Sequence, residues 1–271
     1  MSITPFSNPD LNPARISPAE LRDLIRKGLW PRPTAGCCEG FTQLNLVILP
    51  EIYARDFQIF CEKNPQPCPL LEVIPPGRVE AVKLAPGSDI RTDCPYYKVF
   101  RGENTELRDD IKDLWQDDFV SFLIGCSFTF EQALQANDIP IRHIDLGCNV
   151  PMYVSNISCT PAGPFHGNMV VSMRPVAEAL VQEAIAVTAR YPAVHGAPVH
   201  YGSPAEIGIA DLGSPDFGDP VPIYDGEVPV FWACGVTPQV ALRNLKPEIA
   251  ITHAPGYMFV SDYREEDFRV D

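Results

Sequence analysis

Two segments of the chain place a cysteine directly before a predicted helix. Residues 123–134 read LIGCSFTFEQAL, and residues 231–242 read FWACGVTPQVAL, so that Cys126 and Cys234 align at a spacing of 108 positions. The N-terminus of a helix presents free N–H groups and the positive end of its dipole, which attract carboxylates and lower the pKa of a nearby thiol. We therefore take Cys126 and Cys234 as candidate catalytic residues, and Ser127 as a candidate substrate-binding residue.

The same segments also fit a purely structural interpretation. Thr129 with Gln132 forms a capping-box pattern, and Thr237 before Pro238 is typical of a helix start. Glu131 would stabilise the dipole from the first turn. A capped, buried turn with inert cysteines therefore stays open, while Thr237 is kept as a candidate substrate ligand. The similarity of the two segments is either chance or the trace of an internal pseudo-symmetry.

Three histidines could act as general acids or bases that transfer protons. His195 and His200 flank a Gly-Ala-Pro turn in VHGAPVHYG, and His253 lies in the turn sequence THAPG. Histidine is the commonest general acid or base, so all three are candidate catalytic residues. Hydrogen bonds in the core and turn capping are the alternatives. With Asp211 or Asp262 they could bind a metal, but no spacing requires it, and we expect no metal and no cofactor.

Three further polar residues are candidate substrate-binding residues. Arg174 follows the strand-like VVSM and precedes a proline, which suits a bidentate clamp on a carboxylate or, alternatively, a salt bridge. Asn45 and Asn156 interrupt apolar strand patterns, and buried polar groups need partners. They bind substrate or tie loops together.

Short helices and short strands must together position these residues. The G-x-G-x-x-G and P-loop motifs are absent, and helices and strands alternate without a regular βαβ rhythm. We predict an α+β fold with strongly bent, coiled sheets, mixed or antiparallel, and peripheral helices. The predicted helices are 17–28 (with a Ser17 capping box), 51–64, 175–192 and a short one at 203–209; the predicted strands are 41–50, 119–124, 228–233 and a strand–turn–strand at 249–262.

Composition narrows the class of protein. The 29 prolines are about twice the usual ~5%, which favours short elements, and 45% hydrophobic residues suffice for a large core. A net charge of −14 disfavours binding to nucleic acid or anionic membranes. We expect a flexible N-terminus at 1–14 and a single domain at 15–271.

The cysteines and the N-terminal sequence indicate the compartment. The nine cysteines are odd in number, irregularly spaced and without a C-x-x-C pair, so free thiols in a reducing cytoplasm are expected. No apolar run approaches ~20 residues, and the first residues lack the pattern of a signal peptide. We expect a soluble cytoplasmic protein, and the apolar content permits a homodimer.

Longer motifs resemble a known family. GFTQLNLVILP, NPQPCPLLEV, DIRTDCPYYKVF, FLIGCSFTFE, VSMRP, HGAPVHYG, PVFWACGVTPQ and ITHAPGYMFVSD occur in the order found in the bacterial YcsI-type "putative hydro-lyase" family. That family is similar to the N-terminal region of mitochondrial D-glutamate cyclase. The resemblance spans residues 15–262 and implies coiled, bifurcated sheets and a lyase of amino-acid metabolism. AGCCEG at 35–40 departs from the family pattern, which makes Cys37 and Cys38 poor catalytic candidates.

The resemblance implies a hydro-lyase acting on a small carboxylate, with D-glutamate cyclase-like chemistry. In a cyclase the substrate amine attacks its own side-chain carboxyl group and water leaves. Such a site must hold carboxylates, stabilise an oxyanion and transfer protons. A non-catalytic carboxylate-binding protein and a cysteine-dependent amide hydrolase, which would need a thiol of low pKa, are the alternatives.

Overall fold

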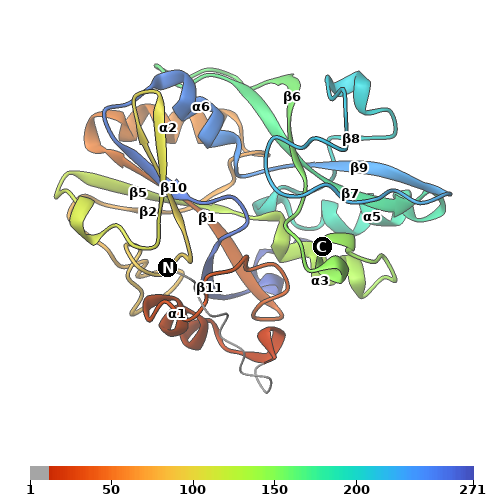
Figure 1. The fold of residues 1–271 in the computed structure, drawn as a ribbon, viewed down its shortest axis with the longest axis horizontal. Helices are drawn as coiled ribbons and strands as arrows, with labels where there is room; N and C mark the ends of the chain where they lie inside the picture. The colour runs from red at the N-terminus through yellow and green to blue at the C-terminus, as the bar shows by residue number, and fades with distance from the viewer. Residues whose placement is uncertain (1–11) are drawn as a thin grey trace.

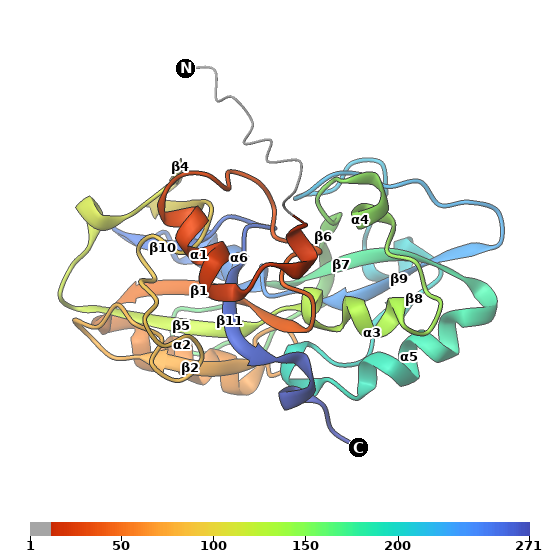
Figure 2. The same ribbon diagram turned by 90° about the horizontal axis from the view of Figure 1, so that it is seen from below.

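Two antiparallel sheets lie side by side along the long axis of the molecule in the computed structural model, which describes residues 12–271 (Figures 1 and 2). The larger, seven-stranded sheet has the order β2-β5-β1-β10-β3-β4, with β11 also paired to β1. Its strands are β1 (Phe41–Pro50), β2 (Leu70–Ile74), β3 (Tyr97–Arg101), β4 (Asn104–Arg108), β5 (Phe119–Gly125), β10 (Ala250–His253) and β11 (Phe259–Arg264). The smaller sheet, in the order β6-β7-β9-β8, contains β6 (Met152–Ser158), β7 (Asn168–Ala177), β8 (His200–Tyr201) and β9 (Glu227–Ala233).

The helices are short and lie around the sheets, which confirms the predicted α+β class. The α-helices are α1 (Pro18–Arg26), α2 (Glu51–Lys63), α3 (Glu131–Gln135), α4 (Arg142–Leu146), α5 (Val181–Ala189) and α6 (Thr237–Leu245). The 3₁₀ helices are η1 (Pro13–Arg15), η2 (Lys112–Leu114), η3 (Ser127–Phe130), η4 (Glu178–Leu180), η5 (Pro192–Val194), η6 (Pro204–Ile207) and η7 (Glu265–Phe268). None of the described helices is long and apolar enough to cross a membrane.

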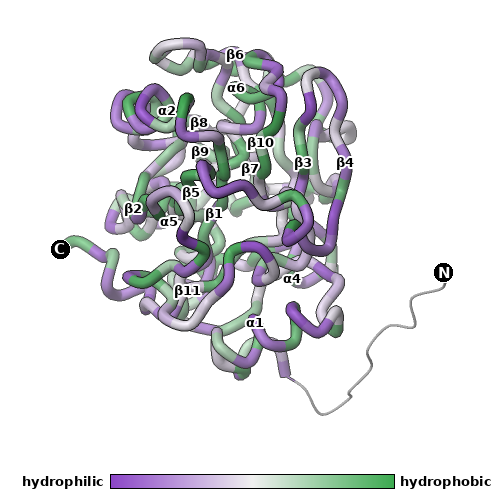
Figure 3. Tube along the Cα trace, turned by 90° about the vertical axis from the view of Figure 1, so that its left-hand side faces the viewer, coloured by the Kyte–Doolittle hydropathy of each residue, from purple (hydrophilic) through white to green (hydrophobic). Residues whose placement is uncertain are grey.

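One apolar core is shared by both sheets. Alternate residues of β1, such as Val47 and Leu49, and of β9, such as Phe231 and Ala233, meet beneath α2 and α6. The opposite face of β9 packs on α5 through Trp232. Figure 3 shows the central strands as largely hydrophobic, whereas the edge strand β4 is hydrophilic. Both sheets are therefore covered on two faces.

The edge of β1 is divided between two strands. Gln43 and Leu44 pair with β11, whereas Val47 and Ile48 pair with β10. At the point of divergence, Nδ1 of His253 lies 3.1 Å from the amide nitrogen of Leu46 and 3.2 Å from its carbonyl oxygen. The imidazole therefore takes the place of a strand partner where the ladder opens. This branching confirms the bifurcated sheet that the family resemblance implies.

The two sheets repeat one arrangement of strands. In the order β10-β1-β5-β2 and the order β6-β7-β9-β8, corresponding strands occupy corresponding places. Each unit runs strand, helix, strand, then a central strand that ends in a cysteine-containing turn and a helix: β1-α2-β2…β5-η3-α3 and β7-α5-β8…β9-α6. The next strand after the last helix of each unit joins the sheet of the other unit: β6, which follows the first unit, pairs with β7, and β10, which follows the second unit, pairs with β1. The similarity of the two segments therefore reflects an internal pseudo-symmetry.

Both threonines of the repeated segments make the same contact. The Thr129 hydroxyl accepts a hydrogen bond from the Gln43 amide at 3.2 Å, and the Thr237 hydroxyl accepts one from the Val170 amide at 3.0 Å. Gln43 belongs to β1, and Val170 belongs to β7, the corresponding strand of the second unit. Each threonine thus ties its turn to the first strand of its own unit.

The predicted helix caps at these threonines are wrong. Thr237 is the first residue of α6, and its N-cap residue, Val236, makes no side-chain cap bond. Thr129 lies within η3, whose N-cap is Cys126. The threonine hydroxyls are used for strand contacts instead, so tertiary contacts override a local capping preference. In contrast, the capping box at Ser17 is confirmed.

The predicted helix at 175–192 begins later than expected. β7 continues through Pro175 to Ala177, and only then do η4 and α5 follow. Pro175 lies opposite Pro229 of β9, so neither side of the ladder offers an N–H at this position. The strands predicted at 41–50, 119–124, 228–233 and 249–262 and the helix at 51–64 are confirmed within a few residues. Of the predicted flexible N-terminus, residues 1–11 lie outside the described residues.

Candidate active site

The two cysteine-containing turns meet at the junction of the sheets. Cys126 and Cys234 belong to one buried cluster with Phe128 and Met258. The side chain of Asn45 lies against both turns: its amide nitrogen donates to the Gly125 carbonyl oxygen at 2.7 Å. The second turn approaches Asn45 so closely that a Cβ atom on Gly235 would lie 2.0 Å from the Asn45 amide nitrogen. Asn45 therefore ties the turns together, the structural alternative considered for it.

Replacing Gly235 by alanine is expected to lower the free energy of unfolding by about 1–3 kcal/mol, measured by urea denaturation. The added methyl group must displace Asn45, which leaves the buried Gly125 carbonyl group without its partner. The background variant Asn45→Ala provides the control, because there the Gly235→Ala change meets no side chain. An equal effect in both backgrounds would show that the contact with Asn45 is not the cause.

Arg174 of β7 is the buried centre of this junction. Its guanidinium binds the Glu131 carboxylate through Nε (3.0 Å) and Nη2, the Ser127 hydroxyl through Nη2 (3.1 Å) and the Ser172 hydroxyl through Nη1 (2.9 Å). The ring of Trp232 lies 5.4 Å from the guanidinium carbon. Of the five N–H groups, one on Nη1 has no acceptor among residues 12–271. The salt bridge considered for Arg174 is present, and most of its donors are directed at the protein.

Glu131 is a buried, ionised carboxylate. Burial opposes its ionisation, but attraction to His143 and Arg174 outweighs burial and holds the pKa of Glu131 below the usual 4.5. His143 Nε2 lies 3.2 Å from Oε1, without the geometry of a hydrogen bond. Oε2 has no hydrogen-bond partner within the described chain. Glu131 does more than stabilise a helix dipole, the role expected for it: it neutralises Arg174 and keeps one free acceptor.

The thiols at the junction are poor nucleophiles. Burial raises the pKa of Cys126 far above its usual value and that of Cys234 to about 11. The neighbouring backbone N–H groups lower both values, but by less than burial raises them. Since the thiolate is the nucleophilic form, the geometry disfavours the cysteine-dependent amide hydrolase.

Two of the three histidines are buried, and one of them, His195, lies near Arg174. Burial lowers the pKa of His195 to about 4, and Arg174 lowers it further; burial likewise lowers the pKa of His253 to about 4. Nδ1 of His195 lies 2.7 Å from the Gln66 carbonyl oxygen. Nε2 of each ring has no partner in the described structure. Both imidazoles are therefore neutral at pH 7, and each keeps one ring nitrogen available.

The other candidates lie elsewhere. His200 is on the edge strand β8, half-buried, with Nε2 2.8 Å from the Ser203 carbonyl oxygen. Asn156 is exposed on β6, at the opposite edge of the same sheet. Thr237 is buried, and its hydroxyl contacts only backbone groups of Val170 and Cys234. The fold thus brings together Cys126, Ser127, Arg174, His195 and Cys234, but separates His200 and Asn156 from them.

Glu131 also lines a small pocket together with two further acidic residues, Glu39 and Glu265. The pocket measures about 250 Å³ and is lined by the 36–41 loop, Gln43, η3, Gln132 and Glu265, among others. Glu265 begins η7, and its amide donates to the Gly40 carbonyl oxygen at 3.0 Å. Burial, with repulsion from Glu266 and Glu39, raises the pKa of Glu265 to about 7. One pocket therefore carries an ionised carboxylate and one that is half protonated near neutral pH.

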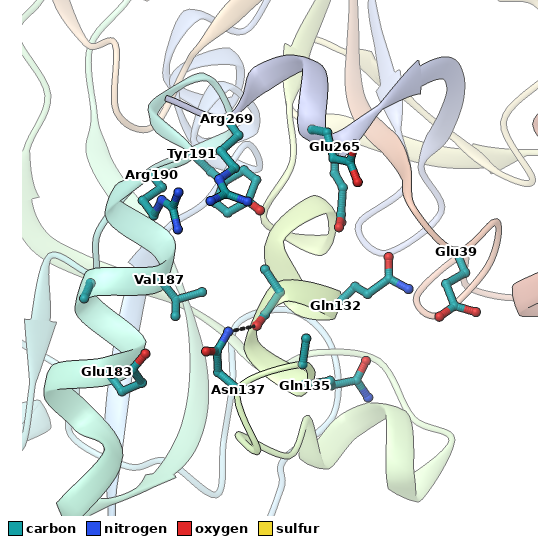
Figure 4. Close-up of a pocket in the computed structure, with 14 residues that line it drawn as sticks. Glu39, Gln132, Gln135, Asn137, Glu183, Val187, Arg190, Tyr191, Glu265 and Arg269 are labelled. Carbon is teal, nitrogen blue, oxygen red and sulfur yellow. Dashed lines mark hydrogen bonds between the residues drawn. The ribbon is translucent and has the colours of Figure 1, made fainter. Parts of the chain in front are cut away.

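This inner pocket adjoins a larger open cleft of about 730 Å³ between α3, α5 and η7 (Figure 4). Both spaces are lined by Glu39, Gln132 and Glu265. Figure 4 shows Arg190 at the end of α5 and Arg269 after η7 at one end of the cleft, where the amide of the next residue, 270, donates to the Arg190 carbonyl oxygen at 2.8 Å. Neither arginine has a carboxylate within 4.0 Å among residues 12–271. The cleft thus holds two arginines together with four carboxylates, Glu39, Glu183, Glu265 and Glu266, and adjoins the pocket of Glu131.

Sequence reasoning missed Glu265 and both arginines. Glu265 lies in the charged run REEDF, which is typical of a solvated chain end. It reaches the pocket only because β11 pairs with the start of β1 and carries the following residues past the 36–41 loop. A pairing between strands more than 200 residues apart cannot be predicted from a short sequence motif. No group of three or more His, Cys, Asp or Glu side chains in the described residues could hold a metal ion.

Comparison with known proteins gives consistent matches over the whole chain. Residues 120–262 match the family model described as D-glutamate cyclase. A protein of Geobacillus kaustophilus is 57% identical over 95% of this chain and 98% of its own length, and its name describes it as a "putative hydro-lyase". "Putative hydro-lyase YcsI" of Bacillus subtilis is 57% identical over 94% of this chain and all of its own length. A solved nitrogen repressor-like protein of Methanococcus jannaschii aligns with a TM-score of 0.38 and 10% identity, too low to bear on fold or function.

Proposed function

Because the chain belongs to the D-glutamate cyclase family, we propose that it is a hydro-lyase acting on a small carboxylate, with D-glutamate as the first substrate to test. One observation supports this proposal above the others: Glu131 and Glu265 line the same pocket, and their pKa values are displaced in opposite directions. Two groups whose environments separate their pKa values are suited to act as base and acid.

The two carboxylates match the proton transfers of a cyclisation. When glutamate closes to a lactam, one C–N bond forms, one C–O bond breaks, and two protons pass from the nitrogen to the departing oxygen, which leaves as water. Ionised Glu131, with Oε2 unpartnered in the described structure, is suited to accept a proton from the nitrogen. Protonated Glu265 is suited to donate one to the oxygen. If Glu131 then passes its proton to the same oxygen and Glu265 takes the second proton of the nitrogen, water leaves and both carboxyl groups return to their starting states.

The cleft supplies the charges that an acidic substrate needs. Arg190 and Arg269 line the cleft that adjoins the inner pocket, and arginine binds carboxylates through paired hydrogen bonds. A substrate carboxylate held there would place the rest of a five-carbon acid toward Glu265 and Glu131. In this proposal Arg174 is a positioning residue, because it holds Glu131 rather than the substrate.

Purified protein incubated with D-glutamate is expected to form the lactam, visible by NMR, with other amino and hydroxy acids tested as alternatives. Glu131→Gln should lower kcat/KM by about 10²–10⁴, because the general base is lost. Glu183→Gln, which removes another carboxylate of the cleft, is the matched control and should retain activity.

A lack of turnover across a broad panel would overturn the proposal. If substrates then raised the melting temperature without turnover, the protein would instead be a carboxylate-binding protein. For the cellular setting we propose the cytoplasm, since all nine cysteines are free thiols and a reducing compartment keeps them so.

A further inference from the structure

Lys98 of β3 and Arg243 of α6 approach the same aromatic ring from different elements. The Lys98 ammonium nitrogen lies 5.5 Å, and the Arg243 guanidinium carbon 5.2 Å, from the centroid of the Phe217 ring. Phe217 lies in the loop before β9 and packs into the buried cluster of Cys126 and Cys234. Two cations thus approach one side chain, and neither of them lines the pocket of Glu131 and Glu265.

These cations have no counter-ion in the described chain. No carboxylate lies within 4.0 Å of Lys98 or Arg243 among residues 12–271. Burial and the proximity of Arg243 lower the pKa of Lys98 to about 8. Like charges placed together destabilise each other, and here they do so in a protein whose net charge is −14. An anion between them would relieve both the repulsion and the loss of solvation.

A pocket of about 380 Å³ opens beside them. Its walls are largely apolar, and its lining includes Lys98, Leu107, Phe217, Pro255 and Tyr257. Glu106 of the edge strand β4 is also part of the lining and is exposed. The pocket therefore combines the ammonium group of Lys98, apolar walls that include Phe217, and a negative charge at its rim that disfavours a second anionic group on the ligand; Arg243 lies against the same Phe217 ring but not in the lining.

We propose that this pocket binds a small organic monocarboxylate, with the carboxylate group at Lys98, in the field of the nearby Arg243, and an apolar body against Phe217, Leu107 and Tyr257. The site is separate from the proposed reaction site, and its ligand differs from an acidic amino acid in carrying one charge and an apolar body. Charge-assisted hydrogen bonds provide the affinity, and the ring of Phe217 provides the contact with the body.

Benzoate is the probe for the experiment, titrated into the full-length protein and followed by ligand-observed NMR. Lys98→Met and Arg243→Met should each weaken binding by about tenfold or more, whereas Lys98→Arg should keep it within about threefold. Arg101→Met, which removes an exposed arginine of the same strand outside this pocket, is the matched control and should bind like the wild type. Benzyl alcohol, which lacks the charge, should bind at least about tenfold more weakly than benzoate.

Three outcomes would overturn the proposal. Benzoate could fail to bind at millimolar concentration, or it could bind equally well to Lys98→Met and Arg243→Met. Inorganic phosphate could bind more tightly than benzoate, which would make this an inorganic-anion site without a role for the apolar walls. Because the readout is binding, none of these outcomes depends on whether the protein turns over D-glutamate.

Discussion

Replacing Arg174 by methionine is expected to lower the free energy of unfolding by about 3–5 kcal/mol. Arg174 is 1% exposed and Glu131 is 2% exposed, so the change leaves a carboxylate buried without its principal cation. Chemical denaturation at pH 7 measures the effect. Because the pKa of Glu131 lies below 4.5, the contribution of the pair is present above that pH and is lost as the pH falls further.

Two further variants separate the cause from a general loss of packing. The double variant Arg174→Met/Glu131→Gln should recover at least about 2 kcal/mol, because it no longer contains an unpaired buried charge. Arg108→Met removes an ion pair with the exposed Asp113 and should change stability by about 1 kcal/mol or less. If the double variant were as unstable as Arg174→Met alone, the unpaired charge would not be the reason.

The activity of the wild-type protein is expected to decrease as the pH rises through about 7. Burial, together with Glu266 and Glu39, places the pKa of Glu265 there, and a general acid works only while it is protonated. Glu265→Gln should lower kcat/KM by about 10²–10⁴ and abolish this limb of the profile. The measurement is kcat/KM for lactam formation between pH 5 and 9.

Above pH 7, the variant Glu265→Gln should change stability and activity in opposite directions if this explanation holds. A carboxyl group whose pKa is raised from 4.5 to about 7 contributes stability that is fully present below 4.5 and is lost as the pH rises through about 7. Glu265→Gln should therefore be at least as stable as the wild type above pH 7, although it is less active. Glu183→Gln, at a carboxylate of the cleft that does not act on the pKa of Glu265, is the control. A pH limb that survived in Glu265→Gln would exclude Glu265 as the acid.

The elements with strong local patterns could be predicted from the sequence. The capping box at Ser17 and the apolar runs of β5 and β9 are set by neighbouring residues and appear where expected. The predicted helix start at Pro175 fails because its strand position depends on Pro229, which lies opposite in β9. Local preference is overridden wherever a distant strand determines the hydrogen bonding.

The residues of the candidate site also divide into those that a local pattern predicts and those that only the tertiary structure brings in. The two cysteine-containing turns were found because each carries a recognisable segment, and the fold brings them together. Glu265 and Arg190 reach the cleft through a strand pairing and a helix end that no short motif records. The electrostatics of a pocket are likewise a property of tertiary structure: the pKa of Glu131 is lowered because His143 of α4 and Arg174 of β7 lie beside it.

The crossing of β6 and β10 between the two repeated units has a consequence for folding. A cut in the loop between β6 and β7, within residues 159–167, would leave each fragment with a three-stranded unit, β2-β5-β1 or β7-β9-β8, whose outer strand, β10 or β6, belongs to the other fragment. Each piece alone would expose a long apolar strand edge, β1 or β7, and such edges promote aggregation. Because each half completes the sheet of the other, the two halves should fold cooperatively and only together. Two separately expressed fragments should be insoluble alone and soluble when co-expressed.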